Sequence, residues 1–347
     1  MGGDRPHRLE RADMEPGHDE WLDQRVETPL DPDQLICDPH HHLWDRPLDR
    51  YLLPDLLADT GSGHSVDRTV FIECRSAYRE DGPAAMRPLG ETEFVAAAAA
   101  ESERAGGSVL AGIVGYVDLR LPEVEDVLAA HVDAGGGRFR GIRHTAAFAP
   151  DMPVGHSKPP PGLMADTSFR SGLAALGRAG LSYDSWIYHP QLSELVDLAR
   201  ACPEVPMILD HIGGPLGTGP YAGRRQEVMA SWQEPMAELA ACPNVNLKLG
   251  GIGMPIFGLD WHHRSEPPGS EELAAAWGGE IRWCIEQFGV ERCMFESNFP
   301  VDKTSCSYTV LWNTFQRIAA DTSPSEKAAL FHDTATRVYR LDAGSDR

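Results

Sequence analysis

Histidines at the ends of apolar segments are the most chemically informative residues of this sequence. The segment QLICDPHHH (34–42) is an apolar run that ends in three consecutive histidines. Because side chains alternate along a β-strand, His40 and His42 would point to one side and His41 to the other. Two imidazoles placed in this way can share one metal ion or one substrate molecule, so we expect His40 and His42 to be functional.

Other apolar runs also end in polar residues. LSYDSWIYH (181–189) ends in His189, and VPMILDH (205–211) ends in His211. The remaining runs add Glu73 and Arg75, Arg143 and His144, Lys248, and finally Glu296, Asn298 and Asp302. Together these residues predict a polar site assembled from the ends of several strands.

The elements that would position these side chains form a repeating pattern. We expect strands at 34–42, 67–74, 109–117, 138–144, 181–189, 205–211, 244–251 and 292–298, most of them followed by a helical segment. Eight such units are what a closed (β/α)8 TIM barrel requires, and in that fold the strand ends carry the active site. Terminal helices over 305–320 and 325–338 would pack against it.

An open, doubly wound α/β sheet is the competing architecture. It would need a glycine-rich phosphate loop after the first strand, where this sequence has its histidine cluster. We therefore predict an N-terminal arm over residues 1–30, partly irregular, and one barrel domain over residues 31–347. The long segments 145–166 and 252–269 would be loops on the catalytic face that act as lids.

Composition excludes several classes of partner. The chain has 347 residues and a net charge of −21, which disfavours binding to nucleic acid or to an anionic membrane surface. No apolar run is long enough for a membrane helix, and no secretory signal is visible. Seven cysteines without a CxxC pair indicate reduced thiols, so we expect a cytoplasmic protein. Assembly into a homo-oligomer is left open.

Four motifs carry a resemblance to a known family. DPHHHLWD, YHPQL, LDHIGGP and MFESNFPVD, in this order, resemble the amidohydrolase-related (amidohydrolase 2) family of the amidohydrolase superfamily. The resemblance spans about residues 34–340. That family includes sugar and dicarboxylic lactonases and, more distantly, metal-dependent decarboxylases, and the resemblance therefore implies a TIM-barrel enzyme of the lactonase-like branch.

The resemblance also implies a metal site and one departure from the family pattern. His40, His42 and His189 would bind a divalent metal, zinc in the first place and manganese as the alternative. The aspartate that usually follows the last strand is Asn298 here. An amide oxygen can bind a metal, but an amide is not a general base at neutral pH. Asn298 would therefore be a neutral ligand, or the base would be His211, Glu296 or Asp302, or the site would be metal-free.

With a metal, the predicted chemistry is hydrolysis. The ion would activate a bound water or polarise a carbonyl, with His211 as general acid or base and with Asn298 and Asp302 as further catalytic residues. Arg75 and Arg143 would bind a substrate carboxylate, and Tyr78 and Trp261 would also contact the substrate. The expected substrate is thus a small anionic molecule, an organic-acid lactone or a related ester-like compound.

Two other functions fit the same residues. One is a metal-dependent decarboxylase or other lyase acting on a small aromatic or unsaturated acid. The other is a non-catalytic barrel that only binds an organic acid, which is suggested by Asn298. Hydrolysis releases a proton at constant carbon count, decarboxylation releases carbon dioxide, and a binder shows no turnover.

Overall fold

The barrel is formed by eight parallel strands that follow one another in chain order around one sheet. The computed structural model describes residues 17–46, 49–107, 109–150, 152 and 159–342. The eight strands are β1 Leu35–His41, β4 Ser65–Ile72, β5 Gly112–Gly115, β6 Phe139–Arg143, β7 Ser182–Ser185, β8 Met207–Leu209, β9 Val245–Leu249 and β10 Cys293–Phe295. Each overlaps one of the predicted runs, so the predicted (β/α)8 barrel is confirmed.

The barrel closes between its first and last strands. His41 forms a parallel bridge with Phe299, just beyond β10. The N–H of Asn298 donates to the carbonyl of His40 at 2.8 Å, and the N–H of His42 donates to the carbonyl of Phe299 at 2.7 Å. Closure therefore takes place at the histidine cluster itself.

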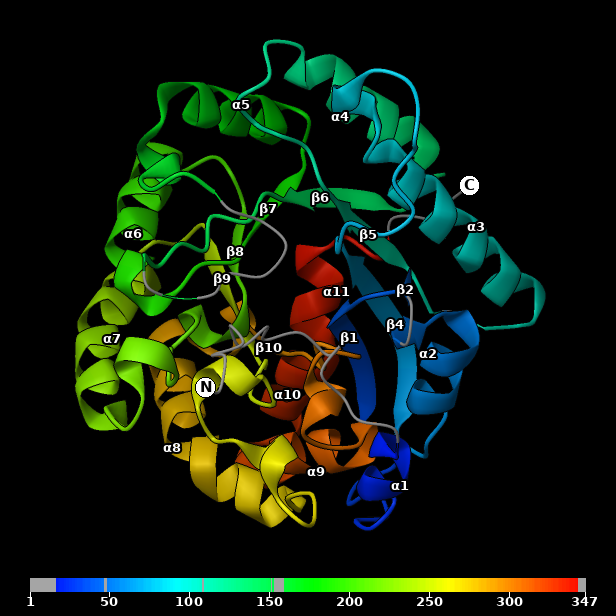
Figure 1. Cartoon of the computed structure of the whole chain (residues 1–347), viewed down its shortest axis with the longest axis vertical. Helices are drawn as coiled ribbons and strands as arrows, with labels where there is room; N and C mark the ends of the chain where they lie inside the picture. The colour runs from blue at the N-terminus through cyan, green and yellow to red at the C-terminus, as the bar shows by residue number, and fades with distance from the viewer. Residues whose placement is uncertain (1–16, 47–48, 108, 151, 153–158, 343–347) are drawn as a thin grey trace, which may run out of the picture.

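Helices surround the strands on the outside, as Figure 1 shows for the ring that runs from α2 to α9. Their bounds are α2 Leu53–Thr60, α3 Leu89–Arg104, α4 Val124–Ala134, α5 Thr167–Arg178, α6 Leu192–Ala201, α7 Arg225–Ala240, α8 Ser270–Phe288 and α9 Tyr308–Ile318. β9 and β10 are buried along their whole length. This burial is typical of a parallel sheet whose faces are both covered.

The last helices of the chain cover one end of the barrel. After α9 the chain forms α10 Pro324–Ala328, a π-helical turn Ala329–Asp333 and α11 Thr334–Val338, which lies across the ring of strands in Figure 1. Ala335, Val338 and Tyr339 pack against apolar side chains from the strands. Both predicted terminal helices are thus present, and the end of the second one packs against the strands inside the barrel.

The N-terminal arm is described from Gly17 onward and lies against the loops and α9. It begins with a short helix, α1 His18–Leu22, and β2 Trp44–Arg46 pairs with β3 Asp49–Tyr51 just after β1. The indole N–H of Trp21 donates to the carbonyl of Arg264 at 2.9 Å, and Asn313 donates to Glu27 at 2.9 Å. Side-chain hydrogen bonds therefore hold this part of the arm against the loop at Arg264 and against α9.

Of the two predicted lid loops, the structure describes the second completely and the first in part. In the loop over 145–166, residue 151 and residues 153–158 lie outside the described part of the chain. The loop over 252–269 contains two short 3-10 helices, η7 Pro255–Phe257 and η8 Trp261–His263. The seven cysteines are free thiols, and among the described residues no helix combines the length and apolarity that a membrane crossing needs.

Candidate active site

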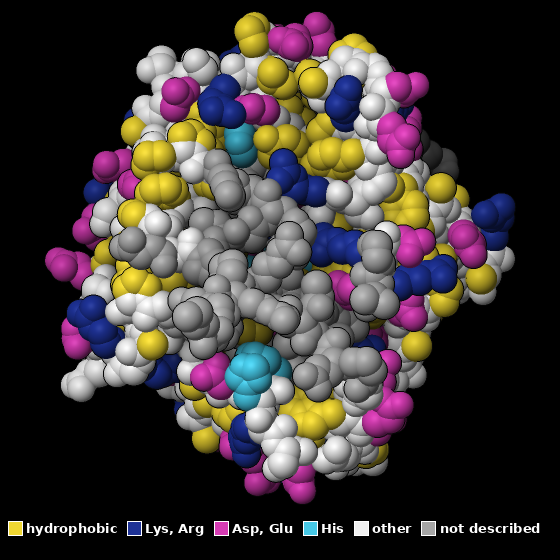
Figure 2. All heavy atoms as spheres, in the orientation of Figure 1, with side chains coloured by type: hydrophobic (Ala, Val, Ile, Leu, Met, Phe, Trp, Pro, Cys, Tyr) yellow, Lys and Arg dark blue, Asp and Glu magenta, His cyan; other side chains and the backbone are white. Residues whose placement is uncertain are grey.

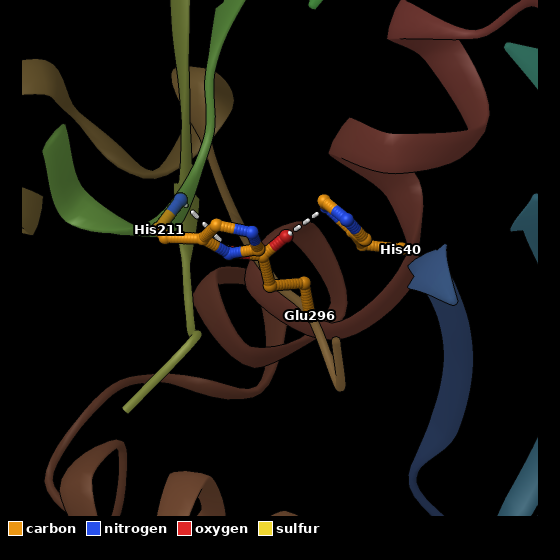
Figure 3. A group of neighbouring side chains, drawn as sticks. All are labelled: His40, His211 and Glu296. Carbon is orange, nitrogen blue, oxygen red and sulfur yellow. Dashed lines mark hydrogen bonds and ion pairs between the residues drawn. The ribbon is translucent and has the colours of Figure 1, made fainter. Parts of the chain in front are cut away.

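A carboxylate joins two imidazoles inside the barrel. Glu296, just after β10, lies between His40 from β1 and His211 from the turn after β8 (Figure 3). Its Oε1 accepts a hydrogen bond from Nδ1 of His211 at 2.7 Å, and its Oε2 lies 2.7 Å from Nδ1 of His40. None of the three side chains is more than 3% exposed. Their nitrogen and oxygen atoms form a group within 4.8 Å of one another, a spacing that could hold a metal ion.

Backbone contacts fix this group in place. The carboxylate of Asp38 accepts the N–H of Ser297 at 2.9 Å, which ties β1 to the segment that carries Glu296. His211 has a positive φ of 53°, an uncommon conformation for a residue with a side chain. A Cβ on the neighbouring Gly251 would lie 2.7 Å from the His211 side chain, so only glycine fits there. Strain and close packing of this kind are characteristic of functional sites.

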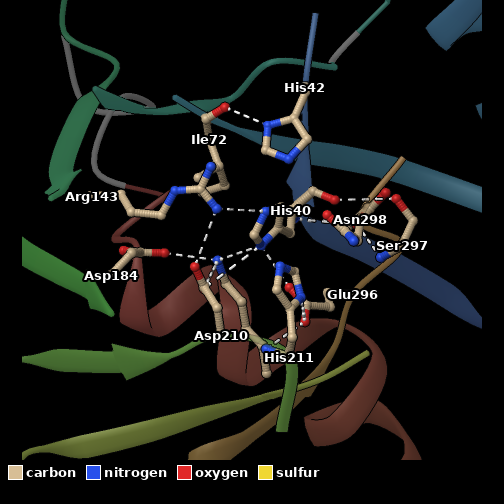
Figure 4. Close-up of polar contacts among 12 residues, drawn as sticks. His40, His42, Ile72, Arg143, Asp184, Asp210, His211, Glu296, Ser297 and Asn298 are labelled. Carbon is tan, nitrogen blue, oxygen red and sulfur yellow. Dashed lines mark hydrogen bonds and ion pairs between the residues drawn. The ribbon is translucent and has the colours of Figure 1, made fainter. Parts of the chain in front are cut away.

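Two buried cations, Lys248 and Arg143, lie next to the imidazole of His40, and Arg143 is labelled beside it in Figure 4. Nζ of Lys248, on β9, is 3.2 Å from Nδ1 of His40, and a guanidinium nitrogen of Arg143 is 3.3 Å from Nε2. Lys248 also contacts Asp184 at 2.7 Å and Asp210 at 3.1 Å. The interior of the barrel therefore holds a network of opposite charges rather than an isolated histidine cluster.

Burial controls the charge state of these groups. It lowers the pKa of His40 to about 4, with the charge of Lys248 acting in the same direction, and it lowers the pKa of His211 to about 3. Burial also raises the pKa of Asp184 to about 6. Although burial opposes it, the positive charge of Lys248 holds the pKa of Asp210 well below its usual range. The imidazoles of His40 and His211 are therefore neutral at neutral pH, and the neutral form is the one that binds metals or accepts protons.

The structure places the three predicted metal ligands in different surroundings. The His42 ring is 5.0 Å from that of His40, and its Nδ1 donates to the carbonyl of Ile72 at 2.8 Å. The Nδ1 of His189 accepts the N–H of Leu216 at 3.2 Å, on a separate turn. Neither His42 nor His189 belongs to a ligand-spaced group among the described residues. The set His40, His42 and His189 therefore stays a prediction, and it is the alternative to the group of His40, His211 and Glu296.

Arg75 and Arg143, which were both predicted to bind a substrate carboxylate, lie in different surroundings. The Arg143 guanidinium is only 7% exposed and is bonded to Glu73 at 3.0 Å and to Asp210 at 3.4 Å. Internal carboxylates thus already bind Arg143. Arg75 is exposed instead and lines a separate cavity of about 130 Å³, together with Glu73, Tyr116, Arg120, His144, Thr145, Pro159 and Pro160.

Tyr78 and Trp261 are both largely covered. The Tyr78 hydroxyl is buried without a hydrogen-bond partner among the described residues, and burial and the neighbouring charges of Glu91 and Glu73 raise its pKa. Trp261 belongs to the main hydrophobic core and is 8% exposed. Their predicted contacts with substrate remain predictions.

Asn298 and Asp302 bind each other. The amide of Asn298 donates to Asp302 at 2.8 Å, and the other oxygen of Asp302 accepts the N–H of Gly253 at 2.9 Å. Asn298 has a φ of 55°, a conformation that asparagine tolerates better than most residues. Burial raises the pKa of Asp302 well above its usual range. Both residues brace the turn after β10 and lie outside the group of His40, His211 and Glu296.

Three residues of this region were missed by the sequence analysis. Asp184 lies in the middle of β7, and a charged residue inside an apolar run was the available signal. Arg120 follows β5 and lines the cavity of Arg75. Glu91, on α3, is 1% exposed and accepts the N–H groups of Cys74 at 3.0 Å and Ser76 at 2.7 Å. Glu91 thereby holds the loop on which Arg75 has a positive φ of 63°.

Comparison with known proteins agrees with this geometry. The family model described as Amidohydrolase matches residues 37–341. The chain belongs to the amidohydrolase family. The predicted family is thus confirmed, and membership of it supports the predicted enzyme of hydrolase type.

Relatives cover nearly the full length of the amidohydrolase chain. A protein of Sinorhizobium fredii named y4mH is 35% identical over 89% of this chain and 99% of its own. The L-fucono-1,5-lactonase of Burkholderia multivorans is 26% identical over 90% of this chain and 98% of its own. A crystal structure of a zinc-bound amidohydrolase from Burkholderia multivorans has a TM-score of 0.70 and 25% identity, covering 88% of this chain and 99% of that one.

The residues of this amidohydrolase fit a divalent cation. Two neutral imidazoles and a carboxylate are a donor set that zinc accepts. Glu296 Oε2 and Asp210 Oδ1 are buried oxygens that both face His40, at 2.7 Å and 3.6 Å from its Nδ1. In this network four carboxylates (Glu73, Asp184, Asp210 and Glu296) surround two cationic side chains (Arg143 and Lys248). A divalent ion would offset this excess of negative charge.

Proposed function

We propose that this enzyme hydrolyses the lactone of a small organic acid. The observation that carries the proposal is the Glu296 carboxylate held 2.7 Å from both His40 and His211 at the strand ends. Such a buried group of imidazoles and carboxylate suits the activation of water or of a carbonyl. The name of the Burkholderia multivorans lactonase supports a cyclic ester as substrate.

His40, His211 and Glu296 are the residues that would hold a divalent cation, with zinc as the first choice and manganese as the alternative. When bound, the cation would supply Lewis-acid polarisation of the substrate carbonyl. Lys248 and Arg143 would keep His40 and Asp210 in position through the contacts described above.

Proton transfer would then fall to His42. Its Nδ1–H donates to the carbonyl of Ile72 at 2.8 Å, which leaves Nε2 as a proton acceptor. Water would attack the lactone carbonyl, Nε2 of His42 would take the proton, and the ring C–O bond would break. The proton would return to the leaving oxygen to give a hydroxy acid. His211 as the acid or base, which the sequence suggested, is the alternative for this role.

The substrate anion would bind in the cavity lined by Arg75 and Arg120. Arg75 and Arg120 both line this cavity, and Glu73, which also lines it, is paired with Arg143 beside His40. Arg120 also forms a two-point ion pair with Asp118 at 2.8–2.9 Å, which holds its guanidinium in a fixed orientation. Guanidinium groups bind carboxylates well, and local positive charge is needed in a protein of net charge −21.

A lactone panel tests the proposal. Purified enzyme with zinc or manganese would be given sugar and carboxylated lactones, and acid release at constant pH would be followed alongside carbon dioxide. We expect acid release without carbon dioxide, and a loss of at least about 100-fold in kcat for Glu296→Gln. Carbon dioxide release from aromatic acids with no lactone turnover would overturn the proposal.

Two histidine variants separate the assigned roles. His42→Asn should keep the metal and lose turnover, whereas His211→Asn should lose metal and turnover together. If His211→Asn keeps the metal and His42→Asn keeps the rate, the acid or base role belongs to His211.

A further inference from the structure

A second group of metal-binding side chains lies on the loop after β9, away from His40. Asp260, His262 and His263 have ligand atoms that all lie within 4.8 Å of one another. Asp260 and His263 are exposed and His262 is partly buried. Histidine side chains are visible at the surface of the face shown in Figure 2. No residue of this group takes part in the chemistry proposed above.

Local backbone geometry brings the three side chains together. Asp260 has a φ of 49°, a left-handed conformation that turns the chain into the 3-10 helix Trp261–His263. The two histidine rings are 3.9 Å apart, with an angle of 43° between their planes. Adjacent imidazoles held this closely on one short turn can present nitrogen atoms to a common ion, and the aspartate supplies an oxygen.

One ring nitrogen of His262 is a second observation that favours a metal site at this loop. Its Nδ1 is buried and has no hydrogen-bond partner among the described residues. A buried polar atom without a partner is unfavourable, so such atoms in native proteins usually have one.

The N-terminal arm packs beside the same loop. The Trp21 indole donates to the carbonyl of Arg264 at 2.9 Å, and Arg25 pairs with Glu266 at 3.4 Å. His18 lies near His262, and its Nε2 is 2.9 Å from the carbonyl of Lys303. An ion bound at this loop would therefore lie next to the junction of arm, loop and barrel.

We propose that Asp260, His262 and His263 form a separate binding site for a divalent transition metal such as Zn²⁺. Two imidazoles and one carboxylate match the ligand preference of zinc, nickel and copper, whereas magnesium and calcium prefer oxygen ligands alone. Water would complete the coordination. The bound ion fixes the loop that contains Trp261 against the arm and stabilises the fold by binding only the native state.

Zinc titration of the full-length protein tests this site. After chelator treatment, zinc binding would be measured by calorimetry and by elemental analysis after dialysis, in the wild type and in His262→Ala/His263→Ala. We expect the double variant to lose one equivalent of zinc and to lose the rise in Tm that zinc causes in the wild type. Asp260→Asn should weaken binding by about tenfold or more, and magnesium should produce no shift.

A matched control is available at His332, which lies beside Asp67 and Asp333 but belongs to no ligand-spaced group in the described part of the chain. His332→Ala should bind as much zinc as the wild type. The double variant should keep its Tm in the absence of zinc, because His263 is exposed and His262 is only partly buried. Equal zinc stoichiometry and affinity in wild type and double variant, or binding of millimolar strength only, would overturn the proposal.

Discussion

The ammonium of Lys248 lies 3.2 Å from Nδ1 of His40 and 2.7 Å from Asp184, fully buried inside the barrel. A fixed positive charge thus stands beside an imidazole that would ligate a cation. Repulsion at this distance in a buried site is large, so Lys248 should weaken metal binding while it neutralises the neighbouring carboxylates.

Lys248→Met should therefore raise the affinity for zinc at the His40 group by about tenfold or more. The measurement is a chelator competition in the His262→Ala/His263→Ala background, which removes the proposed loop site. Loss of the partner of Asp184 and Asp210 should also cost about 3–5 kcal/mol of stability, so folding is checked by circular dichroism. Lys248→Arg keeps the charge and is the control; unchanged zinc affinity in Lys248→Met would contradict the expectation.

Arg75→Gly should remove the proposed anion contact without disturbing the loop. Glycine adopts the φ of 63° at this position easily, so the backbone should keep its path. We expect KM for a carboxylated lactone to rise about tenfold, with little change in kcat and none for a neutral lactone. Arg79→Ala, on the same loop but paired with Glu93 at the surface, is the control. An equal effect on both lactones would argue against an anion subsite.

Asn298→Asp should destabilise the enzyme in a pH-dependent manner. The amide of Asn298 donates to Asp302 at 2.8 Å, so the variant would place two buried carboxyl groups in contact. They would share a proton, and the folded-state pKa of the pair would rise above that of the unfolded chain. Stability is then retained at low pH and lost as the pH rises through that pKa. The loss should be about 2 kcal/mol larger at pH 8 than at pH 5 in denaturant titrations.

The exchanged double variant Asn298→Asp/Asp302→Asn restores one amide and one carboxyl. It should recover most of the stability at pH 8. A double variant as unstable as Asn298→Asp would show that backbone strain, rather than carboxylate repulsion, causes the loss.

Buried His131 should make the protein sensitive to mild acid. It is fully buried with Nδ1 2.8 Å from the Thr92 hydroxyl, and burial lowers its pKa from 6.5 to about 4. Between these values the unfolded chain binds more protons, so stability is full above pH 6.5 and falls as the pH drops towards 4. The shift corresponds to about 3 kcal/mol.

His131→Gln should flatten this part of the stability profile in urea titrations from pH 4 to pH 7. His332 is the contrasting control, because its hydrogen bond to Asp67 raises its pKa. That histidine contributes stability at low pH that is lost as the pH rises, so His332→Gln should not flatten the acid side. A profile unchanged by His131→Gln would mean that other groups dominate acid unfolding.

The strands and the family were predictable because both leave local signals in the chain. Each strand is a short apolar run, and the polar residues at the ends of these runs identify the catalytic face without any knowledge of contacts. His40, His211 and Glu296 were each named as candidates from their positions alone. Their sequence positions could not reveal that Glu296 would face both imidazoles at 2.7 Å.

The side chains with which the charged residues pair could not be predicted from the sequence. The assignment of Arg143 to substrate rested on its residue type, whereas the structure pairs it with Glu73 and Asp210 from neighbouring strands. These pairs depend on strand register and on which face of the barrel each side chain occupies. The same holds for Asp184 and Tyr339, which bind each other across 155 positions of the chain.

Closure of the barrel at His40 and Asn298 has a consequence for synthesis of the chain. The backbone hydrogen bond between these residues joins positions that are 258 apart in the chain. Glu296 follows β10, so it can reach the site only after this last strand has been made. A ribosome would therefore have to make the chain through β10 before the proposed active-site group could assemble. Any fragment that stops before β10 would carry the histidines of β1 without the carboxylate that joins them.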